Sequence, residues 1–250
     1  MRTFKLWDKH KSASYDLSAD ALVSDVRGLG IKFNTIKTNG FVTAVETTYD
    51  PITLGLNFGR DTNAYTAFNQ FMNFIRDNGR NKFILEYQAN GRTIYADVWI
   101  RDIPKGQKTS YNMIQETLEL ERETHWYTLR SENIAVDPAV TTITNQVDDQ
   151  IPALITIDGP ANVEVTIFHE DFNSDEIGRV LVSTNLELGE TLQIDGLNKK
   201  VKKDNDNAYH MINKAYDTFI ILNPGVNKLR VVSSGATPTV TINYREWVID

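Results

Sequence analysis

The sequence contains no cysteine among its 250 residues. This absence excludes disulfide bonds, thiolate catalysis and every cysteine-based metal site. It fits a protein that is made and assembled inside a cell. No run of about 18 apolar residues occurs, so we expect no membrane-spanning helix. The first eight residues lack the apolar stretch of a signal peptide, and no Asn-X-Ser/Thr glycosylation motif is present.

Histidine is also scarce, with four residues and no His-X-His or His-Glu-X-X-His pair. A zinc site would therefore need ligands that lie far apart in the chain. The cluster from His169 to Asp171 could contribute to a metal site, although a solvated strand end explains it more simply. Asp204 and Asp206 resemble the start of a calcium-binding loop, but the positions that need Gly and Glu hold Tyr209 and Ala215. We therefore predict no metal-binding residue.

Signatures of common enzymes are missing too. The chain has no Gly-X-Ser-X-Gly elbow and no Walker loop. The segment Gly28-Leu29-Gly30 lacks the third glycine of a Gly-X-Gly-X-X-Gly motif and precedes a strand rather than a helix. We therefore interpret it as a loop that needs backbone freedom. Glu119 and Glu121 lie two positions apart, a spacing that is common on exposed strands, and we do not interpret them as a glycosidase pair. The sequence predicts no catalytic residue, no cofactor-binding residue and no enzyme.

Charge is unevenly distributed along the chain, whose net charge is −7. Residues 1–132 carry 17 basic and 16 acidic side chains, whereas residues 133–250 carry 9 and 17. The acidic second half argues against nucleic-acid binding there, because phosphate contacts need a basic surface. Solubility is the simplest role of this acidity. The balance changes where turn-forming residues crowd between 131 and 150, so we place a domain boundary near residue 133.

Period-two runs of β-branched and apolar residues indicate strands in the first half. Two pairs of these runs flank an Asn-Gly dipeptide, which favours a tight hairpin turn because both residues tolerate a positive φ. The predicted strands span residues 31–37, 41–49, 52–58, 83–88, 92–100 and 112–122.

One helix interrupts these strands and is predicted over Thr62–Asn78, where apolar residues recur at steps of three and four. Asp61 or Thr62 can cap its start, and Gly79 suits the left-handed residue that ends a helix. We interpret the stripe as a core-facing surface, since a lone helix in a β protein usually covers a sheet; a binding face is the alternative. The stripe consists of Tyr65, Phe68, Phe71, Met72 and Ile75.

The second half consists of many short apolar runs separated by turn residues, a pattern typical of a β-sandwich or jelly roll. Residues 131–150 are predicted to form a connection, and residues 202–207 a loop tip. The predicted strands span residues 153–157, 162–168, 179–184, 191–194, 200–202, 208–212, 218–222, 228–232 and 239–248.

Four patterns occur together in the first 130 residues. They are a helix between two β-rich blocks, a strand that ends in Ile-X-Lys, an alternating strand that ends a few residues before the aromatic pair Trp126-Tyr127, and a short opening strand (Phe4 to Trp7) followed by a Gly-rich loop (Gly28 to Gly30). They lie at residues 62–78, 94–105, 114–127 and 4–30. With them the first half resembles the N-terminal domain of the siphophage distal tail proteins, a family of baseplate hub proteins. The second half, ending in Val240–Trp247, resembles the galectin-like sandwich of that family.

The resemblance implies a mainly β fold and a structural role without catalysis. Residues 1–132 would form an N-terminal, β-sandwich-like, ring-forming domain with one belt helix at 62–78, and residues 133–250 a C-terminal galectin-like β-sandwich. Six copies would form a ring at the bacteriophage tail tip, around a channel that DNA crosses without specific binding. The ring would join the tail tube protein to a tail-associated lysin or fibre protein and to receptor-binding proteins. Its location would be the virion, after assembly in the host cytoplasm.

Two other interpretations stay open. The sandwich could be a carbohydrate-binding or receptor-binding accessory module of a phage tail. However, neither His169 nor His210 begins the His-X-Asn-X-Arg pattern of galectins, and Trp247 lies at the far C-terminal end. A two-domain β enzyme, such as a glycosidase or peptidoglycan hydrolase, would need a perturbed carboxylate pair in a cleft.

Overall fold

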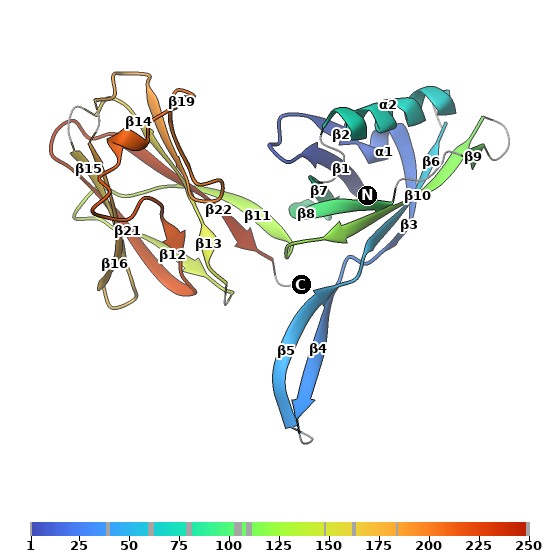
Figure 1. Cartoon of the computed structure of the whole chain (residues 1–250), viewed down its shortest axis with the longest axis horizontal. Coiled ribbons are helices and arrows are strands. Elements are labelled where there is room, and N and C mark those ends of the chain that lie inside the picture. The colour runs from blue at the N-terminus through green and yellow to red at the C-terminus, as the bar shows by residue number, and fades with distance from the viewer. Residues whose placement is uncertain are drawn as a thin grey trace. The chain divides into compact units, whose positions relative to one another are not determined.

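The computed structural model describes residues 2–38, 41–59, 63–78, 82–102, 107–108, 112–147, 149–161, 164–183 and 185–248. The chain folds into two units (Figure 1): unit 1 comprises Met1–Thr128 and Val248–Asp250, and unit 2 comprises Leu129–Trp247. Both are built mainly from antiparallel strands, which confirms the predicted fold class. The sequence places the boundary near residue 133, whereas the chain leaves unit 1 after Thr128 and returns at Val248. None of the helices in these ranges is long and apolar enough to cross a membrane.

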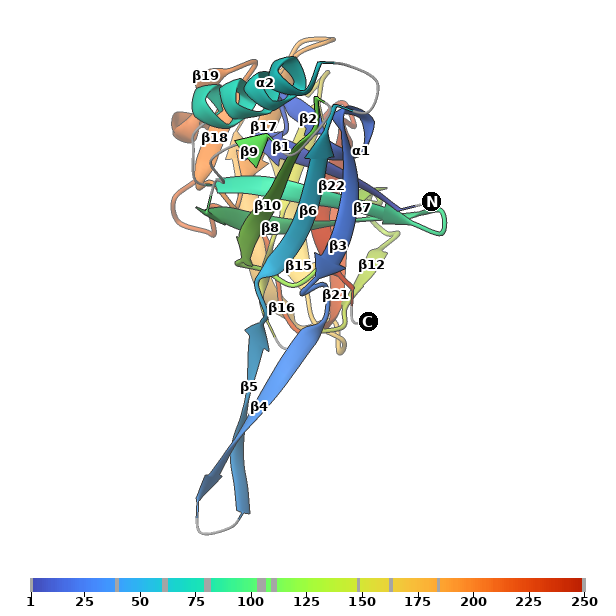
Figure 2. The same cartoon turned by 90° about the vertical axis from the view of Figure 1, so that its right-hand side faces the viewer.

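Unit 1 contains an antiparallel sheet in the order β2-β1-β7-β8-β10-β6-β3, with β9 paired to β10 (Figure 2). Alternate side chains of these strands, such as Leu54, Leu56 and Phe58, form the core of the unit. The predicted turn between β7 and β8 is confirmed, because Asn90 and Gly91 both have positive φ. The strands are β1 (Thr3–Asp8), β2 (Ser14–Asp16), β3 (Ala21–Arg27), β6 (Ile52–Phe58), β7 (Lys82–Ala89), β8 (Arg92–Asp102), β9 (Gln107–Lys108) and β10 (Ile114–Arg122).

Helix α2 (Ala64–Asp77) packs against β2, β6 and β10. Phe71 and Ile75 of its stripe are buried, as predicted, but Tyr65 is 49% exposed and does not belong to the core. A second helix, α1 (Leu17–Asp20), is only one turn long and was not predicted.

The start of α2 is capped by Asn63, whose side chain accepts hydrogen bonds from the backbone N–H groups of Tyr65 and Thr66. This corrects the predicted cap at Asp61 or Thr62, which lie outside the described residues together with the predicted stop at Gly79. The cap fits the general preference for Asn at this position.

Two strands leave the sheet of unit 1 as a separate hairpin: β4 (Ile31–Thr38) and β5 (Phe41–Tyr49). They pair with each other in antiparallel register, which confirms the predicted hairpin, while its Asn39-Gly40 turn lies outside the described residues. Both views show the hairpin projecting from the rest of unit 1 (Figures 1 and 2). We call this hairpin, Ile31–Tyr49, the arm.

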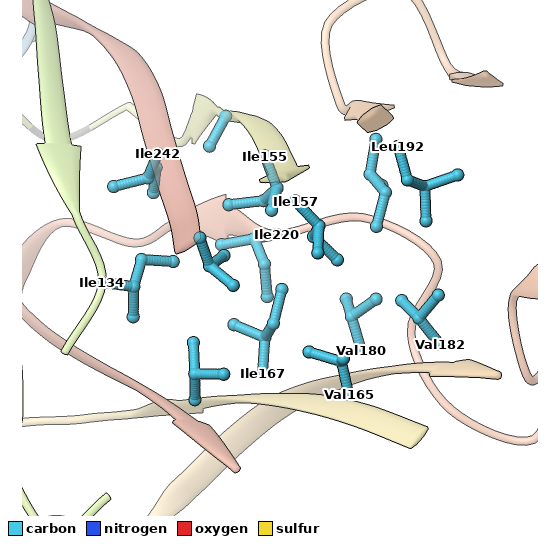
Figure 3. Close-up of a cluster of buried hydrophobic side chains, with 14 of the residues drawn as sticks. Ile134, Ile155, Ile157, Val165, Ile167, Val180, Val182, Leu192, Ile220 and Ile242 are labelled. Atoms are coloured by element: carbon cyan, nitrogen blue, oxygen red, sulfur yellow. The ribbon is translucent and has the colours of Figure 1, made fainter. Parts of the chain in front are cut away.

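Unit 2 is a β-sandwich of two sheets, β19-β18-β17-β14-β22-β11 and β12-β21-β15-β16, with a small sheet β13-β20 beside them. Branched apolar side chains from both sheets meet in its core, as Figure 3 shows for Ile155 and Ile242 above and Val165 and Val180 below. The strands are β11 (Tyr127–Asn133, which begins in unit 1), β12 (Thr141–Asn145), β13 (Ile151–Pro152), β14 (Leu154–Asp158), β15 (Glu164–Glu170), β16 (Glu176–Ser183), β17 (Thr191–Asp195), β18 (Lys200–Lys203), β19 (Asp206–Asn207), β20 (Ile221–Leu222), β21 (Gly225–Ser233) and β22 (Thr239–Trp247).

Three predictions for the second half were wrong in part. Residues 208–212 do not form a strand, because backbone bonds from Met211 to Ala208 and from Ile212 to Tyr209 close a short 3-10 helix, η1 (Tyr209–Met211). The predicted connection over 131–150 contains β12, which pairs along β21. Of the strand predicted over 218–222, only the last two residues form β20.

Candidate functional site

The metal-site candidates do not assemble. Within the ranges that the structure describes, no group of three or more His, Asp or Glu side chains is placed to hold a metal ion. His169 is 4% exposed, so its interpretation as part of a solvated strand end was wrong. It follows Val165 and Ile167 on the inward face of β15, and its Nε2 lies 2.8 Å from Oδ1 of Asn227. Burial lowers the pKa of His169, which keeps the ring neutral near pH 7.

The remaining candidates have ordinary structural positions. Asp204 lies at the turn between β18 and β19, with positive φ, in agreement with the predicted loop tip. Glu119 and Glu121 lie on the outward face of β10, in agreement with their interpretation as neighbours on an exposed strand face. Gly28 has φ of 75°, as expected of a loop that needs backbone freedom.

The arm is the most unusual surface of unit 1. Within the described part of the chain, β4 and β5 pair only with each other. A two-stranded hairpin alone is at best marginally stable in water. A hairpin of this kind therefore gains stability from contacts beyond its own pairing.

The base of the arm is fixed by a buried arginine. Arg122, at the end of β10, is 4% exposed and donates hydrogen bonds to the carbonyl oxygens of Leu29 (3.0 Å) and Gly30 (2.6 Å). The indole N–H of Trp126 donates to the same Leu29 carbonyl at 2.8 Å. On the other side, the guanidinium carbon of Arg122 lies 4.3 Å from the ring centroid of Tyr49, the last residue of the arm. We call Gly28, Leu29, Gly30, Tyr49, Arg122 and Trp126 the base clamp.

Sequence reasoning missed the base clamp, although one signal for it was present. Arg122 continues the inward series of Leu118 and Leu120 at period two, so the pattern points a charged side chain toward the core. A buried charge of this kind requires hydrogen-bond partners.

The outward face of β3, β6 and β10 is mostly polar, with Leu22 as an exposed apolar residue on it. Its aligned rows include Asn57 opposite Gln115 and Gly55 opposite Thr117. The Asn57 side chain also donates to the hydroxyl of Ser24 at 3.2 Å. This face carries one basic side chain, Arg27 opposite Thr53, and two acidic ones, Glu119 and Glu121. It therefore lacks the clustered positive charge that would hold a phosphate chain tightly.

On the outer face of unit 2, Phe168 lies between two arginines. The guanidinium carbons of Arg179 and Arg230 lie 4.6 and 4.2 Å from its ring centroid. Beside Arg179, an open notch of about 430 Å³ is bordered by Tyr216 and Asp217. The segment that contains Tyr216 and Asp217 is hydrogen-bonded to the backbone of β16: the N–H of Asp217 donates to the carbonyl oxygen of Arg179 at 2.9 Å. The free edge of β16 is therefore partly covered, which discourages pairing there.

Comparisons with known proteins agree with this architecture. A family model described as the N-terminal domain of distal tail protein matches residues 3–123. A second model, described as the C-terminal domain of a siphovirus-type tail component, matches residues 150–247. No curated protein matches the sequence.

Two solved structures share the fold over nearly their whole length. The chain is similar to one from the phage P2 baseplate in its activated conformation with Ca, with 13% identity, a TM-score of 0.70 and 99% coverage of both chains. It is also similar to the SPP1 Dit protein, described as a paradigm of the hub adsorption apparatus in phages that infect Gram-positive bacteria. That match has 14% identity, a TM-score of 0.57, and covers 98% of this chain and 99% of the other. With both family models matched in chain order, the protein belongs to the siphophage distal tail proteins, structural components of the phage tail and baseplate hub.

Proposed function

We propose that six copies of this chain form a closed ring at the tail tip, with unit 1 around a central channel and unit 2 at the periphery. One side of the ring meets the tail tube protein, and the other meets a tail-associated fibre or lysin protein. The galectin-like sandwich of unit 2 carries receptor-binding or other baseplate proteins. The chain acts without catalysis or cofactor and joins the virion after assembly in the host cytoplasm.

The arm is the observation that carries this proposal. Among the described residues its strands pair only with each other, and an edge strand of a second copy of the same chain is a partner present at every assembly step. A contact between two unlike surfaces, repeated around one axis, closes a ring when the rotation fits. Subunits joined in this way need no catalytic group.

The polar face of β3, β6 and β10 supports the channel. Outward residues such as Asn57, Gln115 and Thr117 offer hydrogen-bonding groups without positive charge. Tight binding of DNA requires clustered Lys and Arg, because affinity comes mainly from neutralised phosphates. A face of this composition lets DNA pass through without being held.

The test is the mass of the full-length protein in solution, measured by light scattering and native mass spectrometry near neutral pH. The expected mass is six times 28.4 kDa, or twice that value for two rings back to back. A variant with a shortened arm, in which two facing residue pairs are removed from β4 and β5, should stay monomeric. Removing the β18–β19 turn in unit 2 is the matched control and should leave the ring intact. A monomer at every concentration would contradict the proposal.

A second function is favoured by one observation, the open notch in unit 2. Arg179 is held there by Glu176 at 3.0 Å, and its guanidinium carbon lies 5.1 Å from the ring of Tyr216. An exposed aromatic ring beside paired charges is a common arrangement in carbohydrate-binding modules. Titration of the full chain with cell-wall polysaccharide of a Gram-positive host separates the two functions. Binding that Tyr216→Ala abolishes would favour the carbohydrate-binding accessory module, and the ring-forming hub requires none.

A further inference from the structure

The arm is attached to unit 1 at its base, where Arg122 contacts Gly30, just before the arm, and Tyr49, its last residue. Strands β4 and β5 pair only with each other among the described residues. An element that must meet a partner at a fixed angle therefore needs a rigid attachment, and the base clamp is the place where one is built.

The two ends of the arm approach each other closely at this base. Gly28 has φ of 75°, and a side chain there would run into the backbone carbonyl of Pro51. Glycine permits both the left-handed backbone and the close approach. The segments that lead into and out of the arm are thus in backbone contact.

Arg122 holds both segments with one side chain. Its planar guanidinium donates to two consecutive carbonyl oxygens just before the arm, those of Leu29 and Gly30, and lies over the ring of Tyr49, the last residue of the arm. The indole N–H of Trp126 donates a third hydrogen bond, also to the Leu29 carbonyl oxygen. The ring centroid of Trp126 lies 5.4 Å from the guanidinium carbon of Arg122. Only arginine combines a two-donor fork with a flat face for stacking; lysine offers a point charge.

The clamp also fastens the return of the chain from unit 2. The backbone N–H of Val248 donates to the carbonyl oxygen of Trp126 at 2.7 Å, and Val248 packs into the core of unit 1. One buried group of side chains therefore secures the arm and the C-terminal end of unit 1 together.

We propose that Arg122 is the positioning residue of the arm: its guanidinium fixes the angle at which the arm leaves unit 1, and ring assembly depends on that angle. The second half of this statement rests on the proposed function. The first half concerns unit 1 alone and is tested separately.

The absence of cysteine makes the test direct, because two introduced cysteines are the only ones to react with a spin label. One label replaces Thr35 on the arm and the other replaces Asn73 on the exposed side of α2. Labelled protein is diluted with unlabelled protein, so that pulsed electron resonance reports distances within one chain. The parent should give one narrow distance distribution.

Arg122→Lys and Arg122→Met should each broaden this distribution, while exposed Arg92→Lys should leave it unchanged. Trp126→Phe, which removes one of the three hydrogen bonds, serves as a milder variant and should broaden it less. Amide exchange of β7 and β8 checks that the sheet of unit 1 is still folded. A narrow, unshifted distribution in Arg122→Lys would overturn the positioning role, since a point charge would then suffice.

The mass of each variant in solution separates the two claims. Broadening together with loss of the ring supports both. Broadening with an intact ring keeps Arg122 as the positioning residue and counts against the arm as the contact that closes the ring. An unchanged distribution with loss of the ring overturns the positioning role and leaves the proposed ring unaffected.

Discussion

Asn227 is completely buried on β21 of unit 2, and its side chain uses every hydrogen-bonding position. The amide nitrogen donates to the carbonyl oxygens of Asn223 (2.8 Å) and Gly225 (3.0 Å). The amide oxygen accepts from the backbone N–H of Asn223 (2.8 Å) and lies 2.8 Å from Nε2 of His169. Because both amide hydrogens go to carbonyls, His169 must carry its proton on Nε2. The residue ties a turn to the core of the sandwich.

Substituting Asn227 by alanine should therefore be costly. It leaves the buried Nε2–H of His169 without its acceptor, and each buried polar group that loses its partner costs about 1–3 kcal/mol. The Asn223 and Gly225 groups lie nearer the surface, where water replaces part of their bonds. We expect unit 2 to lose about 3–4 kcal/mol of its free energy of unfolding. Exposed Asn173→Ala, the matched control, should change it by less than about 0.5 kcal/mol.

Hydrogen exchange of the slowest amides in each unit is the suitable assay, because a chain with two units need not unfold in one step. Protection should fall in β15 and β21 of the Asn227→Ala protein and stay unchanged in β7 and β8. A loss below about 1 kcal/mol in unit 2 would refute the reasoning, since water would then satisfy the whole network. An equal loss in both units would refute the assignment of the effect to this turn.

Three further predictions use the same assay or urea unfolding. Burial lowers the pKa of His169, so unfolded unit 2 takes up a proton that the folded unit does not; stability should fall as pH drops from about 7 to about 5, and His169→Gln should flatten this dependence. Gly28→Ala should destabilise unit 1 by about 1–3 kcal/mol through left-handed strain and a backbone clash, whereas Gly30→Ala, with open space around it, should change it by less than about 0.5 kcal/mol. Asn63→Ala should cost about 1 kcal/mol by removing the cap of α2, and Asn69→Ala on the exposed side of the same helix should cost nothing.

Much of the fold was predictable where the determining interactions are local. The turn at Asn90-Gly91 follows from two residues that accept positive φ, and β6 follows from strict alternation. The segment 208–212 has an apolar pattern that suits a strand equally well. There the Asn207 side chain accepts from the backbone N–H of Tyr209 at 3.2 Å and helps to form η1 instead. The periodicity of apolar residues carries no information about such a side-chain-to-backbone hydrogen bond.

The candidate site was less accessible to sequence reasoning. Alternation alone places Arg122 inward, but its partner Leu29 lies 93 positions earlier in the chain. Which backbone carbonyls a buried arginine meets depends on how β3, β6 and β10 come together, and a single sequence does not state that pairing. The same holds for His169, whose partner Asn227 lies 58 positions later.

The segments of unit 1 that precede and follow unit 2 in the sequence lie next to each other in space. Trp126 and Val248, which flank it in unit 1, share a backbone hydrogen bond, and within unit 2 Arg130 pairs with Glu246 at 2.6 Å. In the path of the chain, unit 2 is thus inserted between two segments of unit 1. A module with adjacent ends is exchangeable without rebuilding the scaffold that hosts it. Changes within unit 2 can thus leave unit 1 intact, as long as Val248 still packs into its core.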